Sequence, residues 1–329
     1  MGKPVPMAKV ECTIDPFEHL HVAMNPDGSL NRMVDFPVAP TISEDNVKPG
    51  QAYVSKDAPL NPENETWFRM YRPTKIPSND NNVAKIPIIL YFHTGGYILY
   101  DADTMFNNEP CGRFTSELPC ILLSVNYRLA PEHRLPAAYD DAVELLYWLK
   151  QQVLDPNGDK WVRDYADLSR CYLMGCSSGA NIAYRTGLCS TDLDIDPVKV
   201  SGIILNQPLF GGETRTKSEI RLVDDMVMPM SVMDLMWDLA LPVAANRDHE
   251  YANPMSQGAY TDKIGKLPKV LIRGFEGDPL LDRQMELVRL LVKNGVQVTA
   301  HFGEMGFHCI DFIEPKRHFK MITYMKEFI

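Results

Sequence analysis

The sequence reads Gly-Cys-Ser-Ser-Gly at 175–179, between an apolar run at 171–174 and a segment of small residues at 180–184. A Gly-x-Ser-x-Gly pattern between a strand and a helix is typical of a nucleophile elbow, a sharp turn that exposes the hydroxyl of its central serine. The flanking glycines fit because side chains would clash in so tight a turn. Ser177 is therefore the first candidate nucleophile, although short Gly-Ser patterns also occur in ordinary turns.

Strand and helix patterns alternate on both sides of this elbow. Short apolar runs predict strands at 67–71, 86–92, 121–125, 170–174, 200–205, 269–273 and 296–302. Helices are expected at 137–150, 281–293 and 315–328. This alternation predicts an α/β protein with a mostly parallel central sheet that is covered by helices on both faces.

Two regions depart from the alternation. Residues 1–50 are rich in proline and turn signals, which indicates an arm that packs on the rest of the chain. Residues 211–260 contain a helical, methionine-rich stretch. This stretch has two interpretations: a plain pair of core helices, or a cap whose flexible thioethers form an adaptable apolar pocket over the active site.

Composition narrows the possible functions. The chain has 329 residues, 45% of them apolar and 23% charged, and a net charge of −10. An acidic surface without a basic patch argues against nucleic acids and anionic membranes as partners, and favours a small molecule. Seven cysteines without a Cys-x-x-Cys pair, and no apolar stretch of signal-peptide length, predict reduced thiols, no metal site and a cytoplasmic location.

A serine nucleophile needs a histidine as general base. When the serine comes first in the chain, the histidine is expected in a loop near the C-terminus. Two histidines qualify by position, His308 and His318. His308 follows a strand pattern within Gly-Phe-His, whereas His318 lies inside the predicted terminal helix, so we expect His308 to be the base.

The histidine in turn needs a carboxylate that holds its tautomer. Asp278 follows the predicted strand at 269–273 and its turn, which is the position that such an acid occupies. Glu276, earlier in the turn, and Asp282, in the first turn of the next helix, are rivals. A carboxylate in a first helical turn also has a purely structural explanation, because it favours the helix dipole, and we therefore expect Asp278.

The oxyanion that forms on attack needs backbone N–H donors that are already in place. The sequence His93-Thr94-Gly95-Gly96 directly follows the buried strand pattern at 86–92. Adjacent glycines let the backbone approach a substrate oxygen without a Cβ in the way. We expect the N–H groups of Gly95, Gly96 and Ser178 to form the oxyanion hole.

Six motifs in this order resemble one family. They are His-Thr-Gly-Gly at 93–96, Asn-Tyr-Arg-Leu-Ala-Pro-Glu-His at 126–133, Pro-Ala-Ala-Tyr-Asp-Asp at 136–141, the elbow at 175–179, Gly-Asp-Pro-Leu-x-Asp at 277–282 and Gly-Phe-His at 306–308. Together they resemble the hormone-sensitive-lipase type of α/β-hydrolase, and more closely its plant carboxylesterases. The resemblance implies an α/β-hydrolase fold over a single domain, 1–329, with a cap built from about 1–50 and 211–260. It also implies Ser177, Asp278 and His308 as the triad, with no cofactor.

Two positions depart from the family pattern. Thr94 stands where the family usually has the first of three glycines, and this β-branched residue is expected to alter the shape of the oxyanion loop or to bring a hydroxyl near the site. The elbow carries Cys176 and Ser178 where the family often has an acidic residue and alanine. Neither change removes a catalytic group, since Ser178 contributes through its backbone.

The expected function is hydrolysis of small to medium hydrophobic carboxylic esters, such as acetylated plant specialised metabolites, through an acyl-enzyme. A dehydratase or cyclase that uses the same site is the alternative, suggested by Thr94. A hormone receptor of this fold is a further one, although such receptors resemble esterases that have lost the histidine, and His308 is present. The substrate pocket is expected to include Tyr97, Met226, Met233, Trp237 and Phe307.

Overall fold

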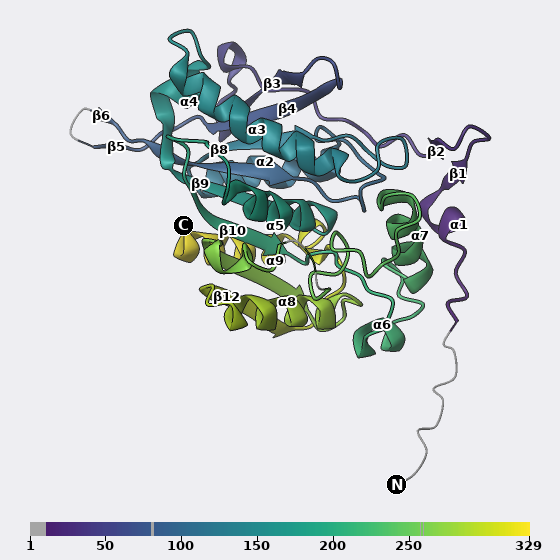
Figure 1. The fold of residues 1–329 in the computed structure, drawn as a ribbon. Coiled ribbons are helices and arrows are strands. Elements are labelled where there is room, and N and C mark those ends of the chain that lie inside the picture. Colours follow the sequence, from purple (N-terminus) through teal and green to yellow (C-terminus); the bar gives the residue numbers. More distant parts are fainter. Residues whose placement is uncertain (1–10, 80–81, 257, 259) are drawn as a thin grey trace.

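Eight strands form the central sheet. Along the chain they are β3 (Tyr53–Asn61), β4 (Thr66–Pro73), β7 (Ile86–Phe92), β8 (Ile121–Asn126), β9 (Ala166–Cys176), β10 (Val200–Asn206), β11 (Lys269–Phe275) and β12 (Val298–Glu304). This computed structural model describes residues 11–79, 82–256, 258 and 260–329. The sheet order is β12-β11-β10-β9-β7-β8-β4-β3 (Figure 1). The pairs β3/β4 and β4/β8 are antiparallel and the other neighbours are parallel.

Helices cover both faces of this sheet (Figure 1). Apolar side chains of α3 (Ala137–Leu154), α5 (Ser178–Ser190) and α8 (Leu281–Lys293) join the buried cluster on one face. Those of α2 (Met105–Glu117) and α9 (Pro315–Phe328) join the cluster on the other. The mostly parallel sheet between two helical layers confirms the predicted α/β class.

The central strand β7 shows why its sequence is an unbroken apolar run. All seven of its residues are buried. Ile88 and Leu90 belong to one buried cluster, and Ile89 and Tyr91 belong to the other. A strand between two helical layers needs apolar side chains on both faces, and the strand predicted at 86–92 is confirmed.

The sequence-based prediction of the sheet missed one of its two edge strands, β3. This strand contains Lys56, Asp57 and Pro59, and much of it is only partly buried. Polar residues and proline are tolerated where one edge of a strand has no neighbour. A search for apolar runs therefore misses β3, whereas it finds the interior strands because they are apolar on both faces.

The remaining elements of the described chain are short. They comprise two hairpins, β1 (Val22–Met24) with β2 (Leu30–Arg32) and β5 (Ser78–Asn79) with β6 (Asn82–Val83). The other helices are α1 (Pro16–Leu20), α4 (Lys160–Tyr165), α6 (Lys217–Arg221) and α7 (Met230–Ala240), with 3-10 turns η1 (Glu44–Asn46), η2 (Ile264–Lys266) and η3 (Ile310–Phe312). Within the described ranges, no helix has the length and apolar character needed to cross a membrane.

The N-terminal arm contacts the methionine-rich helix α7. Residues 1–10 of the arm expected at 1–50 lie outside the described residues. In the described part, α1 packs against α7, and Figure 1 shows the two helices together at one end of the sheet. The hydroxyl of Ser231 donates to Ile14 O at 2.8 Å, and the N–H of Thr13 donates to Asp224 Oδ1 at 2.8 Å.

Candidate active site

The predicted site residues follow the carboxyl ends of parallel strands. The loop at 93–96 follows β7, Ser177 follows β9, Asp278 comes soon after β11, and His308 comes soon after β12. The carboxyl ends of parallel strands meet at one edge of the sheet, which is where ligands bind in open α/β sheets. Segments far apart in the sequence thereby converge on one place.

Ser177 occupies a sharp strand-to-helix turn. Its φ and ψ are 56° and −121°, a conformation that costs a non-glycine residue about 1–3 kcal/mol. A Cβ on Gly175 would lie 2.2 Å from the backbone of Gly179, and one on Gly179 would lie 1.9 Å from Phe92 O. Both elbow glycines are therefore required by close backbone approach, as the pattern predicts.

The structure brings together the three side chains predicted as a triad. His308 Nε2 lies 2.8 Å from Ser177 Oγ, and His308 Nδ1 lies 3.0 Å from Asp278 Oδ2. All three side chains are buried. Because an ionised carboxylate only accepts, Nδ1 carries the proton and Nε2 is left to accept the serine hydroxyl. This arrangement can move a proton from Ser177 to His308.

Asp278 is held by several donors. Its Oδ1 accepts the N–H of Leu280 at 2.9 Å, and its Oδ2 accepts Gln284 Nε2 at 3.1 Å and Gln207 Nε2 at 3.3 Å. These donors, together with His308, all suit a carboxylate anion. Sequence reasoning did not identify Gln207 or Gln284. The position of Gln207, a polar residue at the carboxyl end of the buried strand β10, is the signal that could have revealed it.

The rival groups lie outside this cluster. Glu276 is exposed. Asp282 accepts the N–H of Ser218 at 2.8 Å, where α8 meets α6. His318 packs against Phe114 with ring centroids 4.6 Å apart, and burial lowers its pKa to about 4.

The loop that follows β7 has the backbone form expected of an oxyanion hole. Gly95 and Gly96 have φ values of 126° and 63°, in a region that favours glycine. Among the described residues, none accepts a hydrogen bond from the N–H of Gly95, Gly96 or Ser178. Unpartnered N–H groups at such a site are available to a substrate oxygen.

The first two residues of this loop are buried and have partners. The ring of His93 stacks on Tyr127 with centroids 4.1 Å apart, and burial lowers the pKa of His93 to about 4. The hydroxyl of Tyr127 donates to His93 O at 3.0 Å. Thr94 Oγ1 lies 3.6 Å from Cys309 Sγ. His93 thus supports the loop as a neutral ring, and the hydroxyl of Thr94 is directed to a sulfur.

Two thiols flank the proposed catalytic side chains. Cys176 precedes Ser177, Cys309 follows His308, and their sulfurs are 3.8 Å apart. A hydrogen bond from Cys176 lowers the pKa of Cys309, against the effect of burial, and the His308 imidazolium lowers it further. Burial alone would lower the pKa of His308, but the negative charges of Cys309 and Asp278 raise it above its ordinary 6.5.

The five residues expected to line the substrate pocket fall into different environments. Tyr97, Met233 and Trp237 are buried in the apolar cluster, with the Tyr97 and Trp237 rings 5.6 Å apart. Phe307 is half-buried beside His308. Met226 is 87% exposed, so the structure does not bring it to the site. Its turn is fixed by the adjacent Asp225, whose Oδ1 accepts the N–H groups of Val227 and Met228, and the Met226 side chain is left in solvent.

A different methionine lies against the oxyanion loop. A Cβ on Gly96 would meet Met236 Sδ at 2.2 Å, so the thioether of this α7 residue rests directly on Gly96. Met236 is buried. Met236 belongs to the methionine-rich stretch but was not among the five residues expected to line the pocket, although Met233 and Met236 are spaced so as to share one face of a helix. Helix α7 therefore covers part of the candidate site.

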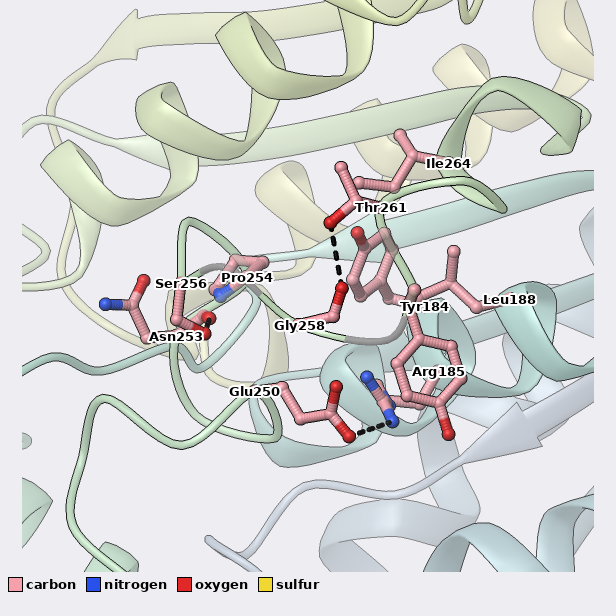
Figure 2. A pocket seen from close by; sticks show the side chains of 11 residues that line it. Tyr184, Arg185, Leu188, Glu250, Asn253, Pro254, Ser256, Gly258, Thr261 and Ile264 are labelled. Carbon is pink, nitrogen blue, oxygen red and sulfur yellow. Dashed lines mark hydrogen bonds and ion pairs between the residues drawn. The ribbon is translucent and has the colours of Figure 1, made fainter.

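A small cavity lies away from these residues. Figure 2 shows it beside the C-terminal half of α5, where Arg185 faces Glu250. Arg185 Nη2 lies 3.8 Å from Glu250 Oε1, and the guanidinium lies 3.8 Å from the centroid of the Tyr260 ring. The cavity measures about 20 Å³, which holds about one water molecule. It is too small for an ester, and the candidate substrate site remains at Ser177.

Comparisons with known proteins agree with this architecture. Residues 89–312 match the family model described as the alpha/beta hydrolase fold. Probable carboxylesterase 9 of Arabidopsis thaliana is 47% identical, over 96% of this chain and 97% of that protein. A 3-O-acetylpapaveroxine carboxylesterase of Papaver somniferum is 40% identical, over 96% of this chain and 97% of that protein.

Solved structures support the fold in the same way. The hyperthermophilic esterase from Pyrobaculum calidifontis superposes with a TM-score of 0.69 at 23% identity, over 82% of this chain and 81% of that chain. This likeness concerns the fold alone. The family match and the plant relatives confirm the resemblance to plant carboxylesterases that the motifs indicate. The chain belongs to the α/β-hydrolase family.

Proposed function

We propose that the protein is a serine carboxylesterase that acts on small to medium hydrophobic esters. The observation that carries this proposal is the continuous chain of contacts from Ser177 Oγ to His308 at 2.8 Å and from His308 to Asp278 at 3.0 Å. A serine hydroxyl becomes a nucleophile when a positioned base removes its proton and a third group orients that base. The carboxylesterases among its relatives support the same reaction class.

In the first half of the reaction, Ser177 Oγ attacks the ester carbonyl and its proton moves to His308 Nε2. The carbonyl oxygen becomes an oxyanion that accepts the N–H groups of Gly95, Gly96 and Ser178. His308 then returns the proton to the leaving alcohol, and the acyl group stays on Ser177 as an ester. Asp278 stabilises the imidazolium while it exists.

In the second half, a water molecule takes the place of the alcohol. His308 accepts a proton from this water as its oxygen attacks the acyl carbon, and the same N–H groups hold the second oxyanion. When the tetrahedral intermediate collapses, the carboxylic acid leaves and His308 protonates Ser177 Oγ. The enzyme returns to its starting state, and no step uses a cofactor.

For the substrate class, we propose acetyl esters of hydrophobic alcohols. Met236 occupies the space above Gly96, close to where an acyl group bound in the oxyanion hole would lie. A short acyl group fits such a restricted position better than a long chain does. Relatives from Papaver somniferum are named for an acetylated compound, 3-O-acetylpapaveroxine, which is consistent with this class.

The proposal includes the cap. In the described part of 1–50, the arm is anchored to α7 through Ile14 and Ser231, and α7 in turn rests on the oxyanion loop through Met236. These contacts support a single domain in which the arm and the 211–260 stretch together cover the site. A cytoplasmic location is part of the proposal, because the seven cysteines are free thiols.

The main alternative, a dehydratase or cyclase, was suggested by Thr94. Its hydroxyl lies 3.6 Å from Cys309 Sγ, and the N–H groups of Gly95 and Gly96 have no acceptor among the described residues. A hormone receptor would not need His308 placed at 2.8 Å from Ser177. Hydrolysis therefore remains the function that we propose.

The test compares the wild type with Ser177→Ala on p-nitrophenyl acetate and butyrate. We expect turnover by the wild type, none above background by the variant, and an organophosphate adduct on Ser177 in the mass spectrum. Turnover that survives in Ser177→Ala would show that another group is the nucleophile. Absence of both turnover and labelling in the folded wild type would refute the hydrolase proposal.

Product masses separate the enzymatic alternatives. Incubation of an acetylated plant metabolite in H₂¹⁸O is expected to give the free alcohol and acetate that carries one ¹⁸O. A product that has lost acetic acid and has no alcohol group would instead indicate elimination. A receptor would bind gibberellin-like acids without turnover.

A further inference from the structure

Gln207 is a buried residue that has no role in the mechanism above. It directly follows β10, its side chain is completely buried, and its φ is 47°. A non-glycine residue in this region is strained, and such residues gather at functional sites when their surroundings hold them there. The side-chain amide of Gln207 makes three hydrogen bonds: one to the proposed acid, Asp278, and two to the backbone on either side of the proposed base, His308.

Two of these bonds hold the backbone on both sides of His308. Gln207 Nε2 donates to Phe307 O at 3.1 Å, and Gln207 Oε1 accepts the N–H of Cys309 at 3.1 Å. The peptide groups before and after His308 are thus held by one planar amide. Cys309 itself has a φ of 62°, so the chain turns sharply just after the base.

The third bond reaches the acid. Gln207 Nε2 lies 3.3 Å from Asp278 Oδ2, the same oxygen that faces His308 Nδ1 at 3.0 Å. Only one orientation of the amide satisfies all three partners. A flipped amide would direct its oxygen at two acceptors, the Asp278 carboxylate and the Phe307 carbonyl, and its NH₂ group at the N–H of Cys309.

Gln284 is the natural comparison within the same site. It is also completely buried, and its Nε2 donates to Asp278 Oδ2 at 3.1 Å. Gln284 belongs to α8 and has no hydrogen bond to the His308 segment among the described residues. The two glutamines therefore share the contact with the acid, and only Gln207 also holds the backbone of the base.

We infer that Gln207 is a positioning residue of the triad, which fixes His308 relative to both Ser177 and Asp278. This inference rests on the proposed esterase function. Displacement of a catalytic group by about 1 Å costs on the order of 100-fold in rate. Loss of the amide is therefore expected to affect the chemical step, whereas substrate binding should change little because the Gln207 side chain is completely buried.

The test measures kcat and KM for p-nitrophenyl butyrate with the wild type and with Gln207→Met, Gln207→Glu and Gln284→Met. Methionine keeps the length of the side chain and removes all three hydrogen bonds. Glutamate keeps the oxygen that accepts from Cys309, but when ionised it donates to neither Phe307 nor Asp278. Urea unfolding of each variant verifies that it is folded, and the rate of organophosphate labelling reports the reactivity of Ser177.

We expect Gln207→Met and Gln207→Glu each to lower kcat and the labelling rate by about 100-fold, with KM within about threefold of wild type. Gln284→Met is expected to lower kcat by less than about tenfold. If Gln207→Met does not fold, the isosteric Gln207→Glu decides.

Three results would overturn the inference. The first is a folded Gln207 variant whose kcat stays within about threefold of wild type, and the second is a Gln207 variant whose KM rises while kcat is unchanged. The third is a loss of kcat in Gln284→Met as large as that in Gln207→Met. The last would assign the effect to the shared Asp278 contact. Failure of the esterase proposal itself is distinct, since it would appear as a wild type without Ser177-dependent turnover.

Discussion

At Gly179 the elbow helix lies directly against the end of the strand that leads into the oxyanion loop. A Cβ at this position would lie 1.9 Å from Phe92 O, 2.5 Å from Phe92 C and 2.6 Å from His93 O. All three are backbone atoms, so no rotation of a side chain relieves the contact. Gly179→Ala must therefore move the start of α5 away from the end of β7.

The size of this movement follows from the distances. Ordinary contact between heavy atoms begins near about 3.5 Å, so a Cβ at 1.9 Å requires a separation of roughly 1.5 Å. The movement would pull the N–H of Ser178 away from those of Gly95 and Gly96. Because about 1 Å of misplacement costs on the order of 100-fold in rate, kcat is expected to fall by about 100-fold or more. Overpacking should lower the free energy of unfolding by about 1–3 kcal/mol.

The matched control is Gly187→Ala in the same helix. Its Cβ would meet the Cδ1 atom of Ile203 at 2.4 Å, and this side-chain tip can rotate away. Because only this side-chain tip has to move, the variant should keep kcat within about twofold of wild type. Alanine also favours a helix by about 1 kcal/mol over glycine. The assay is hydrolysis of p-nitrophenyl butyrate with urea unfolding of the same preparations. A folded Gly179→Ala enzyme with wild-type kcat would refute the argument that backbone contact at Gly179 aligns the site.

Three further variants test other parts of the site. Met236→Ala removes the thioether above Gly96, so kcat/KM for p-nitrophenyl octanoate should rise relative to kcat/KM for p-nitrophenyl acetate. The free energy of unfolding should fall by about 2–5 kcal/mol. An unchanged ratio of the two kcat/KM values would contradict the proposed acyl position. Asp278→Asn leaves His308 without its orienting carboxylate and should lower kcat for p-nitrophenyl butyrate by about 10⁴-fold; a loss below about tenfold would argue against Asp278 as the acid. His308 acts as a base only when neutral, and the negative charge of Cys309 raises its pKa. Cys309→Ala should therefore lower that pKa and shift the acidic limb of the kcat/KM profile to lower pH, and a shift to higher pH would contradict this reasoning.

The parts of the fold that sequence could predict are those with strong local signals. The strand at 86–92 is buried on both faces, so its apolar run is unbroken and its limits are clear. The edge strand β3 is half-exposed and contains Pro59, and no run marks it. The order of serine, acid and histidine predicted which side chains meet at one edge of the sheet, because that order reflects the topology.

Side-chain direction limited the prediction of the pocket. Met226 and Met236 are equally apolar in the sequence, and their difference arises from where α7 begins, at Met230. Residues before this start lie in a turn, whereas Met236 is set by the helical period to face the oxyanion loop. The position of Gln207 after β10 could have marked it as a candidate, but the direction of its amide toward the backbone beside His308 depends on a positive φ that no sequence pattern specifies.

Positive φ angles at non-glycine residues are concentrated around the site. Eight non-glycine residues among those described have such angles, and four of them are Tyr97, Ser177, Gln207 and Cys309. Each costs about 1–3 kcal/mol, a large share of the roughly 5–15 kcal/mol by which a protein is stable. Glycine at Ser177 would relieve this strain but would also remove the hydroxyl that the site needs, so selection for heat resistance alone can gain stability at the expense of activity. Screens for a more robust variant should select for turnover and heat resistance together, and should seek their gains in surface loops away from this edge of the sheet.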